Sequence, residues 1–235
     1  DLQENRWLRV YGKFPDERAI EQAKQAPAAE EPSASPEQAD LQPKKEEALP
    51  LPPKHPRRER ITFTTLHPEI LRDQRHDFHI TDDALGHGTP SEKYAANAAA
   101  IRTLKQIEAE ERLATPEEQE ILSRYVGWGG LANCFEQTSP HYEELKSLLD
   151  SEEYAAARAS SLTAFYTPPV VIRGIYAALG QMGFTQGNIL EPSCGIGNFL
   201  GMLPESMSGS KLYGVELDDL SGRIARQLYQ KSSIA

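Results

Sequence analysis

The chain has 235 residues, a formal net charge of −10 at pH 7, 39% hydrophobic residues and a mean hydropathy of −0.56. These values exclude a protein that coats nucleic acid non-specifically, because phosphate neutralisation needs clustered Lys and Arg, and no apolar run is long enough to span a bilayer. With two cysteines, Cys134 and Cys194, and no secretory pattern, we expect a cytoplasmic protein with no disulfide framework, metal site or membrane partner.

The first sixty residues are expected to pack little. Residues 1–25 carry a few aromatic and aliphatic side chains and start with Asp1 rather than methionine, so we interpret them as the tail of a preceding element. Residues 26–60 are rich in Pro, Ala and Glu, which is typical of a disordered linker. The basic cluster Lys54–Arg60 is interrupted by Glu59 and lacks interleaved aromatics, so a solvated linker end is favoured over a phosphate contact.

Residues 61–160 are predicted to form a mainly helical extension. Apolar residues three or four apart predict a helix over Ser91–Arg112. A second helix is expected to begin at Thr115, where Thr-Pro-Glu-Glu supplies a capping box, and to stop at Gly127.

Shorter elements are expected on either side of these two helices. The alternating run Ile61–Leu66 could form a short strand. Two short helices are predicted over Tyr142–Leu149 and Ser151–Ala159, the latter opened by Ser151.

Two features of the extension allow a functional or a structural interpretation. His76, Asp77 and His79 could suggest a metal site, but no second ligand cluster accompanies them, so surface or hydrogen-bonded roles are favoured. The loop Gly127–Gly130 could present Trp128 to a base or a cofactor. A glycine turn that buries the indole is favoured, because a buried Trp contributes a large contact area.

The segment Phe165–Arg173 is predicted to open another helix. It begins with the aromatic pair Phe165 and Tyr166, followed by Thr167 as a helix cap and by two prolines.

The stretch Asn188–Leu200 is predicted to be a strand, a tight glycine turn and an amphipathic helix. Gly195 and Gly197 would let the backbone approach a ligand, at a turn that can require positive φ. The free N–H groups of the following helix would point at that ligand.

A second strand is predicted over Lys211–Leu217, and its acid, Glu216, lies where a doubly wound fold presents a carboxylate to ribose hydroxyls. Enzymes that use NAD share this feature. However, Gly-Ile-Gly-Asn-Phe-Leu lacks the third glycine of the dinucleotide fingerprint, and Glu191-Pro192 interrupts it, so another cofactor is favoured.

The motifs Tyr-Thr-Pro-Pro, Leu-Glu-Pro-Ser-Cys-Gly-x-Gly-x-Phe and Gly-Val-Glu-Leu-Asp, in this order, resemble motifs X, I and II of the gamma-class DNA adenine-N6 methyltransferases. This resemblance covers Phe165 to about Tyr229. Three further segments, Phe78–Gly88, Ala114–Leu131 and Pro204–Met207, resemble the front part of large methylase–helicase fusion proteins of conjugative elements and phages.

The resemblance implies an α/β fold, an incomplete Rossmann-like methyltransferase domain over residues 161–235, and S-adenosylmethionine as cofactor. Glu216 would accept hydrogen bonds from the ribose hydroxyls, Glu191 would serve the cationic methionine end, and Leu217 would pack on the adenine. Cys194 would line the pocket without acting as a nucleophile. The cofactor-binding residues implied are Phe165, Tyr166, Thr167, Glu191, Ser193, Gly195, Gly197, Glu216 and Leu217.

Methyltransferases of this kind hold the target amino group with an Asn- or Asp-Pro-Pro-aromatic tetrapeptide, and none occurs in these 235 residues. We therefore expect no catalytic residue here, a parallel sheet cut after two strands, and no methyl transfer by this span alone. DNA would be bound through regions outside it, next to a Swi/Snf-type helicase in the same polypeptide.

Two alternatives stay open. A methylase-like domain could serve as a non-catalytic module that docks on DNA or on a partner. A different Rossmann-type enzyme could use NAD.

Overall fold

The computed structural model describes residues 62, 63 and 65–235, which all belong to one unit, Arg57–Ala235. The predicted tail 1–25, the predicted linker 26–60 and the basic cluster Lys54–Arg60 lie outside the described residues. No helix in the described part is long and apolar enough to cross a membrane.

A small parallel sheet lies at the C-terminal end of the chain. Its strands are β1 (Asn188–Glu191), β2 (Lys211–Gly214) and β3 (Ser233–Ile234), in the order β1-β2-β3. Ile189 pairs with Leu212 and Glu191 with Gly214, so β1 and β2 end at the same edge. The expectation of only two strands is wrong, because a two-residue strand has no apolar pattern of its own and forms only by pairing with β2.

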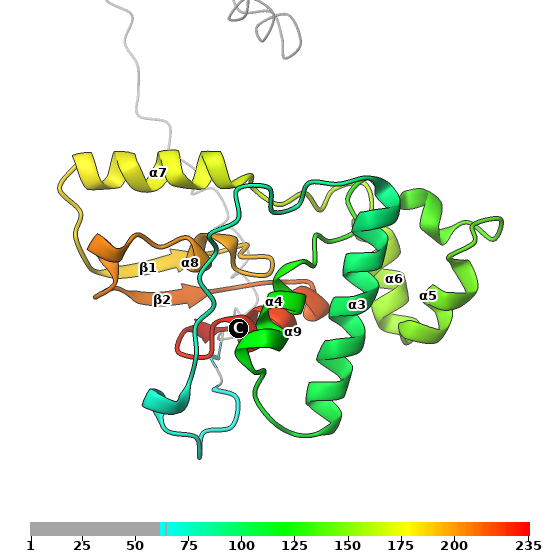
Figure 1. Cartoon of the computed structure of the whole chain (residues 1–235), viewed down its shortest axis with the longest axis horizontal. Coiled ribbons are helices and arrows are strands. Elements are labelled where there is room, and N and C mark those ends of the chain that lie inside the picture. Colours follow the sequence, from blue (N-terminus) through cyan, green and yellow to red (C-terminus); the bar gives the residue numbers. More distant parts are fainter. Residues whose placement is uncertain (1–61, 64) are drawn as a thin grey trace, which may run out of the picture. The chain divides into compact units, whose positions relative to one another are not determined.

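Three helices accompany the sheet. They are α7 (Pro169–Gln181), α8 (Asn198–Gly201) and α9 (Asp219–Leu228), with a 3-10 turn η3 at Glu205–Met207. Figure 1 shows α7 running alongside β1 and α9 lying next to α4. Parallel strands joined through helices place the described unit in the α/β class.

The preceding residues are mainly helical, as predicted. The elements are η1 (Arg72–Gln74), α3 (Pro90–Ala109), α4 (Pro116–Ser123), η2 (Ala132–Phe135), α5 (Tyr142–Leu148) and α6 (Ser151–Ser160). Capping boxes open both long predicted helices, at Thr89 and at Thr115, and Tyr94, Ala98, Ile101, Leu104 and Ile107 of α3 are buried.

Three local predictions are wrong. The described residues of Ile61–Leu66 form no strand. Helix α4 ends at Ser123 rather than at Gly127, because its last turn closes with Arg124 in helical backbone geometry as the C-cap. The N-cap of α6 is Asp150, whose carboxylate accepts hydrogen bonds from two first-turn N–H groups; a carboxylate caps as well as a hydroxyl and adds a favourable charge.

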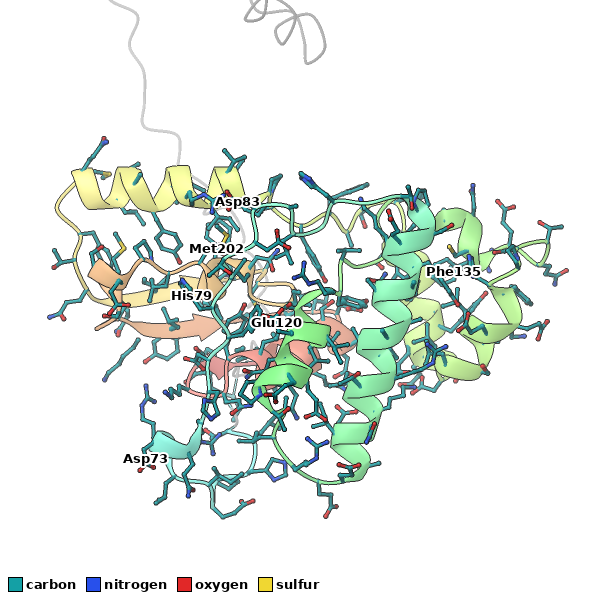
Figure 2. The ribbon with its side chains drawn as sticks, viewed as in Figure 1. Asp73, His79, Asp83, Glu120, Phe135 and Met202 are labelled. Carbon is teal, nitrogen blue, oxygen red and sulfur yellow. The ribbon has the colours of Figure 1, made fainter. Side chains whose placement is uncertain are left out.

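The main apolar core joins the helical extension to the sheet region. It contains Ile101 and Leu104 of α3, Trp128, and Ile224 and Leu228 of α9 in one cluster. A second cluster packs α7 against β1 through Ile172, Tyr176, Ile189, Met202 and Met207. In Figure 2, Met202 lies below α7 and Phe135 lies on the α5–α6 side of α3, so the two clusters occupy different parts of the unit.

A buried acid ties three helices together. Glu153 of α6 is only 8% exposed and accepts from Lys105 Nζ of α3 at 2.6 Å and from Arg223 Nη1 of α9 at 2.8 Å. Arg223 also pairs with Glu108 at 2.6 Å. Burial raises the pKa of Glu153, but these ionic hydrogen bonds outweigh it and hold the pKa below its ordinary value of 4.5.

Replacing Glu153 with Gln is expected to lower the free energy of unfolding by about 2 kcal/mol at pH 7. The loss stays below that of a fully buried pair because Lys105 is 35% exposed. A depressed carboxylate pKa stabilises the fold above the unfolded-state pKa, and this stabilisation is lost as pH falls through the folded-state pKa. Urea unfolding at several pH values should therefore show the difference shrinking below pH 4.5; a difference independent of pH would contradict the assignment.

Candidate functional site

The candidate site is built where the ends of β1 and β2 meet the turn between β1 and α8. The Val215 N–H donates to the Glu191 carbonyl at 2.9 Å, and the Cys194 N–H donates to the Val215 carbonyl at 3.0 Å. These bonds fold the turn back across the end of β2. They bring two acids, Glu191 and Glu216, to the same edge of the sheet, as parallel strands require.

The Glu216 carboxylate joins two loops. Its Oε2 accepts from the Gly195 N–H at 2.7 Å, and its Oε1 accepts from the Asp218 N–H at 2.9 Å. A carboxylate has about four lone-pair sites, so roughly two remain for a ligand. Glu216 is thus held in place by the backbone while keeping acceptor capacity.

Gly195 is packed under an aromatic ring. Its φ is +55°, and a Cβ added there would lie 2.7 Å from Cε1 of Tyr166. The Tyr166 hydroxyl lies 3.1 Å from Oγ of Ser221, which donates to the Asp218 carboxylate at 2.5 Å. Positive φ and the Tyr166 ring together require glycine here; the approach of a cofactor to this backbone stays a prediction.

Glycine is required at position 197 for the same two reasons, with a different aromatic ring. Its φ is +91°, and an added Cβ would lie 2.3 Å from Cε2 of Tyr229, a fully buried residue. Gly197 lines neither of the cavities described below. Helix α8, which follows it, has four residues, so the predicted amphipathic helix is a single turn whose dipole is small.

Thr167 is not a helix cap, contrary to the prediction. The N-cap of α7 is Pro168, and no side chain caps this helix. Pro169, at the first helical position, has no N–H, so this helix begins with one unpaired donor fewer. Thr167 instead lines a cavity.

Two neighbouring cavities collect most of the predicted residues. One, of about 560 Å³, and the other, of about 320 Å³, share Phe165, Tyr166 and Ser193 in their walls. The first is also lined by Gly195 and Glu216, the second by Thr167 and Glu191.

Leu217 lies outside both cavities. Its side chain is fully exposed, at 100%. A leucine in water at the edge of the site is free to contact an apolar ligand face, but within the described residues it packs on nothing.

Burial raises the pKa values of two groups at the end of β1, the Glu191 carboxyl and the Cys194 thiol. It raises the pKa of Glu191, against a backbone hydrogen bond from Ser193 that lowers it. Burial, followed by the nearby Glu216 charge, raises the pKa of Cys194 to about 12. The Cys194 thiol therefore stays protonated near neutral pH, which disfavours a nucleophilic role.

Several polar residues line the cavities without having been predicted as site residues. Among them are Asn198, at the smaller cavity, and Tyr125, Asp218 and Ser221, at the larger one. Asn198 Oδ1 is buried and has no hydrogen-bond partner within the described structure. Asp218 could have been found from sequence, since an Asp three residues before Ser221 is a helix N-cap pattern and the structure shows that cap. Tyr125 belongs to the helical extension and reaches the larger cavity through tertiary packing, which no local sequence pattern indicates.

The Gly127–Gly130 loop packs on the segment that carries Tyr166. Trp128 is 1% exposed, so the prediction of a buried indole is confirmed. A Cβ added at Gly129 would lie 2.1 Å from the Ala164 carbonyl oxygen, and the Gly130 N–H donates to the Ser161 carbonyl at 3.1 Å.

Asn97 of α3 fixes the same loop from the other side. The residue is 0% exposed, its Nδ2 donates to the Gly127 carbonyl at 2.7 Å, and its Oδ1 accepts from the Val126 N–H at 2.8 Å. The helical extension therefore sets the position of the cavity wall through Asn97, the glycine loop and residues 161–166.

His76 and Asp77 make structural contacts with the C-terminal part of the chain. The His76 N–H donates to Gln230 Oε1 at 2.9 Å, and the Asp77 carboxylate accepts from the Lys231 N–H at 2.8 Å. Asp77 also forms an antiparallel bridge with Tyr229. These contacts support the predicted hydrogen-bonded role for His76 and Asp77.

Comparison with known proteins gives two partial sequence matches. Over 139 residues, 59% of the chain, the sequence is 27% identical to "Defense against restriction protein B" of Escherichia phage P1. Over 62 residues, 26% of the chain, it is 37% identical to a type II methyltransferase of Paramecium bursaria Chlorella virus XZ-6E. The matches span 5% and 16% of those proteins, respectively.

No family model and no solved structure matches the chain. The chain is thus an α/β protein with partial sequence similarity to a viral methyltransferase and to a phage protein named for defence against restriction.

Proposed function

We propose that residues 161–235 form the S-adenosylmethionine-binding part of a Rossmann-like DNA adenine-N6 methyltransferase, within a larger methylase–helicase protein of a mobile element. The observation that carries this proposal is the convergence of three separate segments, Phe165–Thr167, Glu191–Gly195 and Glu216, on two adjoining cavities. The partial similarity to a viral methyltransferase supports the same reaction class.

The residues at these cavities fit the cofactor. When bound, S-adenosylmethionine supplies an electrophilic methyl group on a sulfonium. Its ribose diol would take the free lone pairs of Glu216, which two backbone N–H groups already orient. Its ammonium would meet the Glu191 carboxylate and the unpartnered Oδ1 of Asn198, both at the smaller cavity. An exposed Leu217 would cover one face of the adenine.

Transfer of the methyl group would also need residues that hold the target amino group. The 235 residues contain no Asn- or Asp-Pro-Pro-aromatic tetrapeptide, so we propose that they bind cofactor without holding the target amino group. For the whole protein, the proposal includes DNA as a partner, a helicase in the same polypeptide, and a cytoplasmic role in defence against restriction.

Replacing Glu216 with Ala is expected to weaken S-adenosylmethionine binding about ten- to a hundredfold, because a charged acceptor is removed from the ribose site. Isothermal titration calorimetry measures the change. Circular dichroism should be recorded in parallel, since the variant also loses the acceptor of the Gly195 and Asp218 N–H groups.

Glu205→Ala is the matched control, because Glu205 is an exposed acid in η3, outside both cavities. Equal cofactor affinity in folded Glu216→Ala and in the control would remove the basis of the proposal. Tight binding of NAD in place of S-adenosylmethionine would replace it with a dinucleotide enzyme.

A further inference from the structure

Helix α7 carries apolar residues on every side, but only one side is covered. Ile172 and Tyr176 are buried in the second cluster, which packs α7 against β1. Figure 1 shows α7 at the margin of the described unit, with β1 on its inner side. The outer side of α7 is exposed and consists of Val170, Val171, Gly174, Ala177 and Ala178. A helix that is apolar all round is typically buried all round, so this outer side has the composition of a covered surface.

Gly174 lies in the middle of the outer side, and no contact within the described residues requires a glycine there. A Cβ added at this position would meet nothing within 4 Å, and the residue lies inside α7. Glycine in the interior of a helix costs roughly 0.5–1 kcal/mol relative to Ala. Glycine also allows a second backbone to approach closely. The residue therefore suits a contact that the chain does not make with itself.

The outer side is complementary to itself when two copies of α7 lie antiparallel. A two-fold axis at Gly174 places Val170 of one copy opposite Ala178 of the other. It also places Val171 opposite Ala177, because each pair is equally spaced about the glycine. A larger side chain then always faces a smaller one, and the two backbones cross at glycine. A two-fold interface uses the same patch on both copies, so it requires such self-complementarity.

The electrostatics of α7 favour the same antiparallel arrangement. Among the described residues, no side chain caps its N-terminus, and the helix has no acid in its first turn and no basic residue in its last turn. The partial charges at its two ends, positive at the N-terminus and negative at the C-terminus, are therefore not compensated by side chains. An antiparallel copy brings opposite ends together. The charged residue of α7, Arg173, is paired with Asp83, so it adds no repulsion between copies.

Nucleic acid and membranes suit this surface less well than a second copy. Nucleic acid is bound through clustered Lys and Arg. Helices that lie on a membrane surface are also rich in Lys and Arg. Helix α7 has Arg173 as its one cation, and that cation already has an acidic partner.

We propose that the outer side of α7 is the interface of a homodimer, in which two chains pack through antiparallel copies of this helix. One 13-residue helix per copy is smaller than a standard interface of roughly 20–30 residues a side. We therefore expect a weak dimer, with a Kd on the order of 10 μM. The inference is independent of the proposed cofactor site.

Sedimentation velocity of the 235-residue chain tests this proposal at concentrations from about 1 to about 100 μM, which bracket the expected Kd. The native chain should change from monomer to dimer across this range. Val170→Glu should stay monomeric throughout, because dimerisation would bury an unpaired charge. Val170 is 71% exposed, so the variant should still fold, and circular dichroism checks this.

Leu71→Glu is the matched control. Leu71 is 64% exposed, lies outside α7, and its replacement changes the net charge of the chain by the same amount. This variant should dimerise like the native chain.

Gly174→Ala provides a second test that a merely local role for the glycine would not pass. The added methyl would lie between the two backbones in the dimer but meets nothing in the single chain. We expect the dimer to weaken about tenfold, because overpacking destabilises a close contact. The monomer should be at least as stable as the native one.

Three results would overturn the proposal. A native chain that stays monomeric up to about 100 μM would exclude the expected dimer. A dimer that survives both Val170→Glu and Gly174→Ala would use another surface. Equal dissociation in Val170→Glu and Leu71→Glu would reflect net charge instead of this interface. If the monomeric chain instead co-sediments with uncharged phosphatidylcholine vesicles, the outer side of α7 binds lipid and the homodimer is wrong.

Discussion

Replacing Gly129 with Ala is expected to lower the free energy of unfolding by about 3 kcal/mol and to abolish the proposed cofactor binding. The added methyl would lie 2.1 Å from the Ala164 carbonyl oxygen, a backbone atom that cannot rotate away. Overpacking a well-packed site typically costs about 1–3 kcal/mol, and a backbone clash lies at the upper end of that range. Relief of the clash requires Ala164 to move. Because Phe165 and Tyr166 follow Ala164 directly and line the cavity, the cavity wall moves with it.

Gly174→Ala supplies the control for that measurement. Gly174 lies exposed in α7, where an added Cβ meets nothing within 4 Å, so helix propensity predicts a gain of roughly 0.5–1 kcal/mol. Chemical denaturation of both variants gives the two free energies. A Gly129→Ala variant as stable as the native chain would show that the loop does not pack on Ala164 as described.

Local signals predicted the helices well. The capping box at Thr115 and the apolar spacing of α3 are encoded within a few neighbouring residues, and the structure shows both. Elements that depend on a partner were missed. Strand β3 has two residues and is defined by hydrogen bonds to β2, which no window of sequence contains.

The same distinction applies to the candidate site. The order of motifs pointed to Glu191, Glu216 and Tyr166, and the structure brings these three residues to adjoining cavities. The reasons for the glycines could not be predicted, because the ring over Gly195 comes from 29 positions earlier and the ring over Gly197 from 32 positions later in the chain. Such contacts depend on tertiary packing, which periodicity and spacing do not report.

Asn97→Ala is expected to lower the free energy of unfolding by about 3 kcal/mol, because it leaves the part-buried Val126 N–H and the buried Gly127 carbonyl without their partner. Each orphaned group costs about 1–3 kcal/mol. Asn133→Ala is the control, since Asn133 lies in η2 and its side chain makes none of these bonds.

Stability alone would not distinguish a positioning role for Asn97 from a general packing role, so the decisive measurement is local. Hydrogen exchange followed by mass spectrometry should show faster exchange over residues 126–130 in Asn97→Ala and an unchanged rate in β1. Because the loop holds the segment that places Tyr166 over Gly195, cofactor affinity should fall in the same variant at temperatures where it remains folded. If exchange rises equally across the whole unit, Asn97 supports the core in general and the helical extension does not set the position of the cavity wall.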